Sequence, residues 1–191
     1  MTTPTLTADL TQLAGTYTID PSHTRIGFVA RHAMVTKVRG AFNDFEGTLH
    51  LDGTDPARST ARVRIDAASI DTRNAQRDEH LRSNDFLDME NYPEITFQST
   101  EAKQLDDTTF QLTGDLTIKG ITKPVTVDFT FEGAAKDPFG NERVGFEGAV
   151  TINRKDWGVN WNAALEAGGV LVSEKVTLEF DVSAVRSGDS A

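Results

Sequence analysis

Apolar and polar residues alternate strictly along most of this chain. In the segment 24–32, for example, Ile26, Phe28 and Ala30 occupy every second position. A period of two residues is typical of a β-strand, in which successive side chains point to opposite faces of the sheet. The same period returns in later segments, at 45–51, 62–67, 94–105, 111–118, 125–131, 144–152 and 170–182. The sequence therefore predicts about eight β-strands.

Short turn sequences separate most of these segments. They combine Gly, Pro, Asp or Asn, which favour turns, at 52–59, 105–109, 119–124 and 136–142. Short connections between successive strands imply antiparallel neighbours. A sheet of this size with one apolar face can bury that face by closing on itself, and closure also removes the exposed edges. We therefore expect an all-β fold, an extended eight-stranded antiparallel up-and-down barrel.

Two stretches interrupt the alternation. Residues 71–91 have sparse apolar positions, which indicates a short helical excursion that either Asp71 or Thr72 would cap. Residues 157–168 lie between two strongly alternating segments, and a loop with one helical turn is expected there.

The length of 191 residues suits one domain with one core. We expect a polar N-terminal lead-in at 1–14, a single barrel domain at 15–186 and a flexible tail at 187–191. The N-terminus has neither the basic segment nor the apolar run of a signal peptide, so a cytoplasmic protein is expected. No stretch approaches the roughly 18 to 20 apolar residues of a transmembrane helix.

Charge and cysteine content exclude several classes of function. The formal net charge is −10, with 29 acidic and 19 basic residues, which repels nucleic-acid phosphates and anionic lipid surfaces unless a local basic patch overrides it. No block of consecutive basic residues supplies such a patch, so no nucleic-acid partner is expected. The absence of cysteine excludes a disulfide framework, a thiolate nucleophile and a zinc site built on sulfur.

Candidate catalytic and metal-binding groups are few. The histidines have no metal-ligand spacing and lie apart in the sequence, at His23, His32, His50 and His80. Asp78 and His80 could form an acid–base pair in which the carboxylate orients the imidazole. Residues two apart on a helix point to different sides, however, and exposed ion pairs and caps explain these charges more simply. We therefore name no catalytic residue and no metal ligand.

The interior of the expected barrel alternates large and small residues. Examples are Leu112 with Gly114 and Phe146 with Gly148. Glycine on an apolar face leaves room for a slender ligand, although glycines that ease barrel curvature around a filled core are an alternative. The residues expected to line the pore are Ile26, Phe28, Ala30, Val63, Ile65, Phe97, Leu112, Leu116, Phe129, Phe146, Gly148, Val150 and Trp157.

Four stretches, at 17–47, 69–99, 114–129 and 153–159, resemble the successive signatures of the YceI-like family of polyisoprenoid-binding proteins. The resemblance covers about residues 15–185, in order and at natural spacing. It implies a lipocalin-like barrel with a helix beside it, whose apolar pore holds a long isoprenoid or a similar amphiphile. No enzymatic activity is established for the family as a class. The resemblance implies no required cofactor, although a polyisoprenoid lipid could be bound.

The segment 74–86 matches the family's "RD-x-HLRS-x-DF" signature. The resemblance implies that it forms the helical excursion against the barrel, with Phe86 and Leu87 packed inward. Arg77, Asp78 and His80 in this segment are second-choice contacts to a ligand head group, and His32 is a further candidate outside it.

These inferences predict a soluble, non-enzymatic protein that binds a polyisoprenoid or fatty-acyl ligand for carriage, storage or stress-related isoprenoid or quinone metabolism. One alternative is an enzyme acting on such a lipid, with His80, Asp78 or His32 as acid–base groups. Another is an interaction domain with a filled core. A homodimer is left open, because polar outer faces such as that of residues 111–117 could pair across a two-fold axis.

Overall fold

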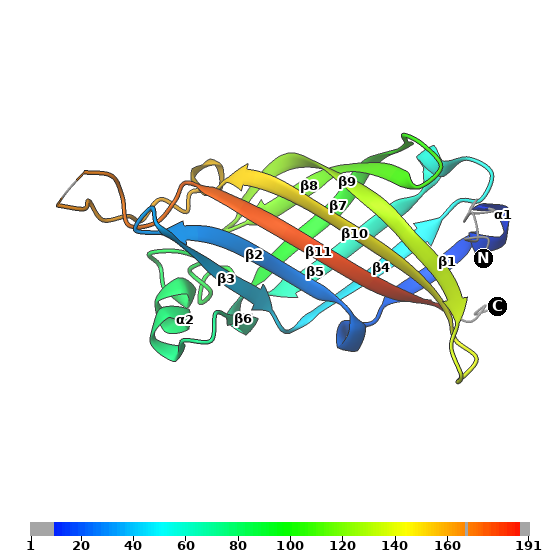
Figure 1. Cartoon of the computed structure of the whole chain (residues 1–191), viewed down its shortest axis with the longest axis horizontal. Helices are drawn as coiled ribbons and strands as arrows, with labels where there is room; N and C mark the ends of the chain where they lie inside the picture. The colour runs from blue at the N-terminus through cyan, green and yellow to red at the C-terminus, as the bar shows by residue number, and fades with distance from the viewer. Residues whose placement is uncertain (1–9, 167, 188–191) are drawn as a thin grey trace.

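The computed structural model describes residues 10–166 and 168–187 (Figure 1). Within these residues the strands are β1 Gly15–Ile19, β2 Arg25–His32, β3 Thr36–Phe42, β4 Phe45–Leu51, β5 Thr60–Asp66, β6 Ile70–Asp71, β7 Glu94–Gln104, β8 Thr109–Ile118, β9 Ile121–Lys136, β10 Glu142–Asn153 and β11 Lys175–Arg186. The α-helices are α1 Leu10–Leu13 and α2 Ala75–Arg82. Single 3₁₀ turns occur at η1 Pro21–His23, η2 Pro56–Arg58, η3 Ala67–Ser69 and η4 Arg154–Trp157.

The strands close into a barrel. All pairings are antiparallel, and β11 pairs with both β1 and β2, which closes the sheet. Because β1 and β2 follow one another along β11, they share one position in the barrel; β3 and β4 share the next, and β5 and β6 the third. With β7 to β11 these described strands fill eight positions. The expected eight-stranded up-and-down barrel is therefore confirmed.

The register of the long strands sets which side chains point inward. Residues directly opposite one another in an antiparallel pair share a face of the sheet. On β8 and β9, Phe110 lies opposite Phe129 and Leu112 lies opposite Val127. The apolar positions of successive strands therefore meet in the same interior. The core residues there form one cluster of Ile19, Ile26, Phe45, Ile65, Ala67, Ile95, Leu116, Ile152 and Trp157, and a second of Tyr17, Phe131, Val144 and Ala184.

The helical excursion is confirmed as α2, but its expected cap is wrong. Asn74 caps the helix, and its side chain accepts a hydrogen bond from the backbone N–H of Arg77. Asp71 belongs to β6, and Thr72 is buried with its side chain bonded to Asp78, so neither is available as the cap.

The second interruption also differs from expectation. The helical turn expected at 157–168 is η4, Arg154–Trp157, and the described residues from 158 to 169 contain no helix. The turn ends early because Gly158 adopts a left-handed conformation, with φ of +72°. A long non-helical loop therefore follows η4 and lies at the same end of the barrel as α2 (Figure 1).

The structure describes the two ends of the chain only in part. Of the expected lead-in and tail, residues 1–9 and 188–191 lie outside the described residues. Helix α1 precedes β1, and the strands run from Gly15 to Arg186. In the described part of the chain, no helix is long and apolar enough to cross a lipid bilayer.

Candidate functional site

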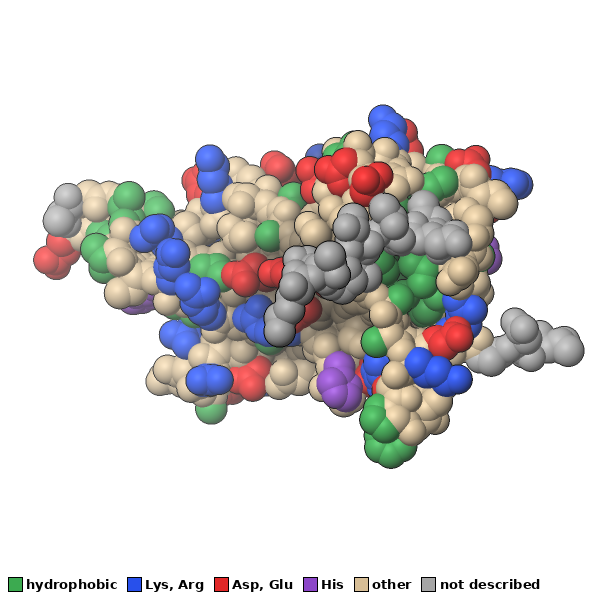
Figure 2. Space-filling view, turned by 45° about the vertical axis from the view of Figure 1, so that its right-hand side comes forward, with side chains coloured by type: hydrophobic (Ala, Val, Ile, Leu, Met, Phe, Trp, Pro, Cys, Tyr) green, Lys and Arg blue, Asp and Glu red, His purple; other side chains and the backbone are tan. Residues whose placement is uncertain are grey.

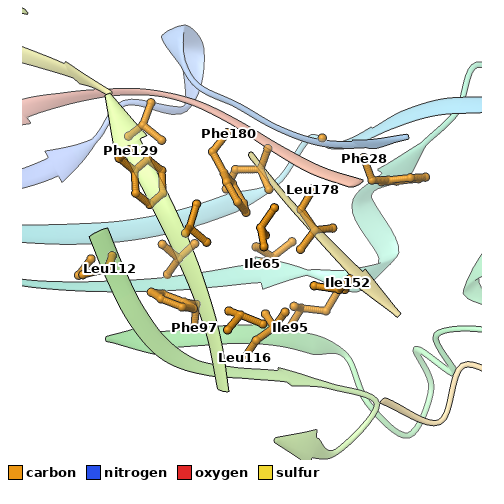
Figure 3. A pocket seen from close by; sticks show the side chains of 18 of the residues that line it. Phe28, Ile65, Ile95, Phe97, Leu112, Leu116, Phe129, Ile152, Leu178 and Phe180 are labelled. Carbon is orange, nitrogen blue, oxygen red and sulfur yellow. The ribbon is translucent and has the colours of Figure 1, made fainter. Parts of the chain in front are cut away.

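An internal cavity of about 320 Å³ runs through the barrel. It extends from Leu13 and Leu51, where β1 begins, to Trp157 and Val159 at the end occupied by α2. Figure 3 shows side chains from several strands, among them Phe97, Leu116 and Phe129, turned into the same space. The alternating face of each strand thus forms a continuous apolar wall.

The structure places nearly all of the proposed pore residues on this wall. Of the predicted residues, those that line the cavity are Ile26, Phe28, Ala30, Val63, Ile65, Phe97, Leu112, Leu116, Phe129, Phe146, Val150 and Trp157. Gly148 is on the inward face but does not line the cavity, since a Cβ atom there would lie 2.8 Å from the ring of Phe129. Phe86 and Leu87 also line the cavity, so their expected inward packing is confirmed.

The glycines of the inward face do not create empty space, contrary to the reasoning from sequence. A Cβ atom at Gly114 would overlap the ring of Phe97, and one at Gly40 would overlap the ring of Phe28. Gly40, Gly114 and Gly148 are thus each covered by an aromatic ring from the neighbouring strand, whereas Gly47 is covered by the side chains of Ile19 and Val63. Glycines paired with aromatic rings are found in strongly curved sheets. The cavity is what remains after these rings have packed.

The cavity wall contains few polar side chains. Among the described residues that line it, these are Asp52, Ser59, Thr60, Gln111 and Arg154. Asp52 and Ser59 belong to the connection between β4 and β5, Thr60 begins β5 and Gln111 belongs to β8, at the end where β1 begins. Arg154 lies at the opposite end, on η4. A ligand inside the barrel would therefore meet polar groups only towards its two ends.

Arg154 is a buried cation that the sequence reasoning missed. Its residue surface is 6% exposed, and burial lowers the pKa of its guanidinium. The guanidinium donates hydrogen bonds to three backbone carbonyl oxygens, those of Val159 at 2.6 Å, Ser173 at 2.8 Å and Val172 at 3.3 Å. The neighbouring carboxylate of Glu174 pairs instead with Lys155, at 2.8 Å. Arg154 therefore holds the loop that follows η4 across the end of the barrel. Its burial could not be predicted from the sequence, because a single basic residue in a turn sequence is usually exposed.

Two tryptophans connect neighbouring segments at the same end of the barrel. Trp157 is 3% exposed, and its indole nitrogen donates a 2.8 Å hydrogen bond to the carbonyl of Leu116. Trp161 packs edge-on against His80 and contacts Phe86, with ring centroids 4.7 Å and 5.3 Å away. The loop after η4 is thereby joined to both β8 and the α2 segment.

None of the second-choice head-group residues lines the cavity. His32 is exposed at the end of β2. The guanidinium of Arg77 donates hydrogen bonds to the hydroxyl and the carbonyl of Thr72, at 2.7 Å and 2.8 Å. The buried carboxylate of Asp78 accepts from the N–H and the hydroxyl of the same Thr72, at 2.8 Å and 2.5 Å. Arg77 and Asp78 therefore stabilise the start of the excursion.

His80 has a different partner from the one considered in the enzyme alternative. Its Nε2 lies 2.8 Å from Oδ2 of Asp85, and not beside Asp78. Asp78 and His80 are thus held by separate partners, as expected for residues two apart on a helix. Among the described residues, no group of three His, Asp or Glu side chains is close enough to hold a metal ion.

Comparison with known proteins gives consistent results. The family model of the YceI-like domain matches residues 17–184. A UPF0312 protein of Pseudomonas savastanoi pv. phaseolicola is 40% identical over 149 residues, which cover 77% of this chain and 78% of that protein. The crystal structure of Burkholderia cenocepacia BcnA aligns with a TM-score of 0.76 and 25% identity, covering 86% of this chain and 98% of the other. A polyisoprenoid binding domain from Saccharophagus degradans, implicated in plant cell wall breakdown, has the same fold, with a TM-score of 0.68, 13% identity and coverage of 90% and 98%.

Proposed function

We propose, from the premise that this chain belongs to the YceI-like domain family, that its barrel encloses the apolar tail of a polyisoprenoid or a similar long-chain amphiphile. The observation that carries the proposal is the cavity, which follows the barrel from the start of β1 to Trp157 and is lined almost wholly by apolar side chains in the described part of the chain. The fold shared with a domain described as polyisoprenoid binding supports the same ligand class.

The physical chemistry of such a wall favours a long, thin, apolar ligand. Each methylene group moved from water into it contributes about 0.8 kcal/mol, so a tail of many carbons binds tightly without any polar contact. The wall discriminates weakly between chains of similar thickness, because one methylene more or less changes the affinity little. A fatty-acyl chain therefore belongs to the same ligand class, and selectivity rests on groups at the ends of the cavity.

A binding role is better supported than the enzyme alternative. A general acid or base must reach the reacting atom of its substrate. Asp78, His80 and His32 do not line the cavity, and the first two are held by Thr72 and Asp85. The filled-core alternative is less favoured, because a cavity of about 320 Å³ remains after the aromatic rings have packed over the glycines.

The experiment that tests the proposal is native mass spectrometry of the purified protein, followed by solvent extraction and lipid analysis. The matched variants are Val150→Trp, which places an indole in the cavity, and Ala149→Trp, which places the same group on the exposed face of the same strand. We expect a stoichiometric long-chain lipid on the wild type and on Ala149→Trp, and a reduced amount on Val150→Trp. A bare wild-type chain that also refuses added isoprenoids and fatty acids would refute the proposal.

The finer parts of the function are predictions that rest on the sequence. They are contact of His32, Arg77, Asp78 or His80 with a ligand head group, carriage or storage in isoprenoid or quinone metabolism, a cytoplasmic location and a homodimer. The identity of the extracted head group tests the first two. Cell fractionation of the untagged protein tests the location, and light scattering after size-exclusion chromatography tests the dimer.

A further inference from the structure

The turn between β2 and β3 exposes large apolar side chains. Met34 is 59% exposed and Val35 is 75% exposed. Ala33 and Met34 both adopt positive φ, at +49° and +64°, so the backbone spends conformational energy to form this turn. Exposed apolar side chains that lie together and are bordered by polar residues mark sites of contact with another protein or with a membrane.

This apolar tip is fixed to the loop that closes the α2 end of the pore. The N–H of Ala33 donates a 2.7 Å hydrogen bond to the carbonyl of Leu171, and the backbone N–H of Ser173 donates to the carbonyl of Arg31 at 3.0 Å. Val172, between these two contacts, lines the cavity. Figure 1 shows the hairpin and this loop projecting together beyond the end of the barrel. These two backbone hydrogen bonds therefore fix the tip to the loop that lies at this end of the pore.

Four exposed cations lie next to the tip on adjacent strands. Arg31 is on β2, Lys37 and Arg39 are on β3, and Lys175 begins β11. Together with Met34 they border a groove on the outer face of the barrel. Figure 2 shows basic side chains in a row beside the hydrophobic side chains of the projecting end. The chain thus assembles a local basic patch, although its net charge is −10.

The arrangement of these cations is unfavourable for the isolated protein. Arg31 lies directly opposite Lys37 in the ladder, and like charges in such a pair destabilise a sheet. The carboxylates that border the groove already have other partners, since Glu174 pairs with Lys155 and Glu179 with Arg25. An external anion would relieve the repulsion between the four cations.

Protection of a sheet edge explains only part of this patch. On its free side β3 pairs with β6 only at Ala41 and Phe42, and lysine on an exposed edge discourages aggregation. That accounts for Lys37 and Arg39. Arg31 belongs to β2, which pairs with β11 and β3, and Lys175 belongs to β11, which pairs with β10 and β2. Neither strand is a sheet edge, so edge protection does not explain these two cations.

The opposite end of the barrel lacks this combination. Phe139 is 89% exposed in the turn between β9 and β10. Asp137 and Arg143, beside the same turn, pair with each other at 2.8 Å. An exposed apolar side chain is thus present at both ends, but among the described residues only the α2 end combines it with the row of four cations.

We propose that the protein docks on anionic phospholipid bilayers with this end, so that Met34 and Val35 enter the interface while Arg31, Lys37, Arg39 and Lys175 contact lipid phosphates. Apolar insertion and cationic attraction together give reversible peripheral binding that weakens with salt. Docking goes beyond the proposed tail binding, and it would place the pore end where a long-chain lipid enters or leaves.

The test is co-sedimentation with vesicles of phosphatidylglycerol mixed with phosphatidylcholine, and with vesicles of phosphatidylcholine alone. We expect the wild type to bind the mixed vesicles, to bind the neutral vesicles much less and to dissociate in high salt. Lys37→Glu combined with Arg39→Glu should weaken binding by about tenfold or more. Because these glutamates keep the β3 edge charged, a loss of binding would not reflect lost edge protection.

Matched controls separate the patch from general effects. Arg62→Glu combined with Lys103→Glu changes the net charge equally on the exposed faces of β5 and β7, and should bind like the wild type. Met34→Ser combined with Val35→Ser should weaken binding, whereas Phe139→Ser should not. Removing the exposed carboxylate of the neighbouring loop by Glu166→Gln should strengthen it.

Several results would overturn the proposal. These are no binding to the anionic vesicles, equal losses in the patch and control variants, or displacement by millimolar inorganic phosphate alone, which would indicate a site for free phosphate. A dimer that Met34→Ser with Val35→Ser converts to a monomer, without vesicle binding, would instead identify an interface between copies. Val150→Trp should still sediment with vesicles, so a failure of docking and a failure of tail binding are distinguishable.

Discussion

Trp157 donates a 2.8 Å hydrogen bond from its indole nitrogen to the backbone carbonyl of Leu116, and this bond ties η4 to β8. The indole is 3% exposed and belongs to the same buried cluster as Leu116. A buried carbonyl on a barrel strand thus receives its hydrogen bond from a side chain that also forms the cavity wall. Trp157 therefore both donates a hydrogen bond to the backbone of β8 and lines the pore.

We expect Trp157→Phe to lower the free energy of unfolding by about 1–3 kcal/mol, because phenylalanine keeps most of the apolar contact but leaves the carbonyl of Leu116 without its donor. Urea denaturation at neutral pH measures this loss. Trp161→Phe is the control, since the half-buried Trp161 makes ring contacts but its indole nitrogen donates no hydrogen bond within the described part of the chain. Equal losses in the two variants would show that the hydrogen bond is unimportant.

Arg154→Met should release the loop that follows η4. Three backbone carbonyls lose a charged donor, and we expect a loss of about 2–4 kcal/mol in the free energy of unfolding. Hydrogen exchange of the amides at 168–173 should accelerate more than that of β8. The control is Lys155→Met, which removes an exposed ion pair with Glu174 and should cost less than about 1 kcal/mol. Unchanged exchange in the loop would contradict the assigned role of Arg154.

Gly114→Ala should be unusually costly for a single methyl group. Its Cβ atom would overlap the ring of Phe97 and lie 2.6 Å from the carbonyl oxygen of Gln98. Overpacking of this kind typically costs about 1–3 kcal/mol. At Gly145 a Cβ atom would meet nothing nearer than 3.7 Å, so Gly145→Ala should be nearly neutral. Thermal unfolding of both variants makes the comparison, and similar melting temperatures would refute the proposed packing of Phe97 over Gly114.

Stability should fall in acid because of the cluster formed by Arg143 with Asp20 and Asp137. Arg143 donates to these two carboxylates at 2.7 Å and 2.8 Å. The hydrogen bond from Arg143 is the main cause that lowers the pKa of Asp20. For Asp137, desolvation raises the pKa, but hydrogen bonds from Arg143 and Asn141 outweigh it and bring the pKa to about 2.

The direction of the effect follows from these shifts. An aspartate whose pKa is lower in the folded state stabilises the fold above the unfolded-state pKa of about 3.9, and this contribution is lost as the pH falls towards the folded value. We therefore expect stability to decline between about pH 4 and pH 2, and Arg143→Met to flatten that decline. Urea titrations at several pH values measure it, with Arg64→Met, which breaks an exposed pair with Glu46, as the control. The same slope in wild type and Arg143→Met would rule the cluster out as its source.

The barrel and most of its lining could be predicted from the sequence because the information is local. Alternation in the segment 111–118 places Leu112 and Leu116 on one face whatever the neighbouring strand is, since the pleat repeats every two residues. The position of Phe97 over Gly114 could not be predicted, because it depends on the register between β7 and β8. The burial of Arg154 was missed for a similar reason: the carbonyls that it binds belong to a loop up to nineteen residues away.

The basic patch shows most clearly which features the sequence determined and which the tertiary structure decided. The sequence by itself determined the period-two strands, their apolar faces and a net charge that disfavours anionic partners, because these depend on composition and on backbone geometry. It contains no basic block, and so it predicted no basic surface. Only the tertiary structure placed Lys175 beside Arg31 and Lys37, through the pairing of β11 with β2 and of β2 with β3. Neighbours across a sheet are decided by long-range pairing and register, which local patterns do not encode.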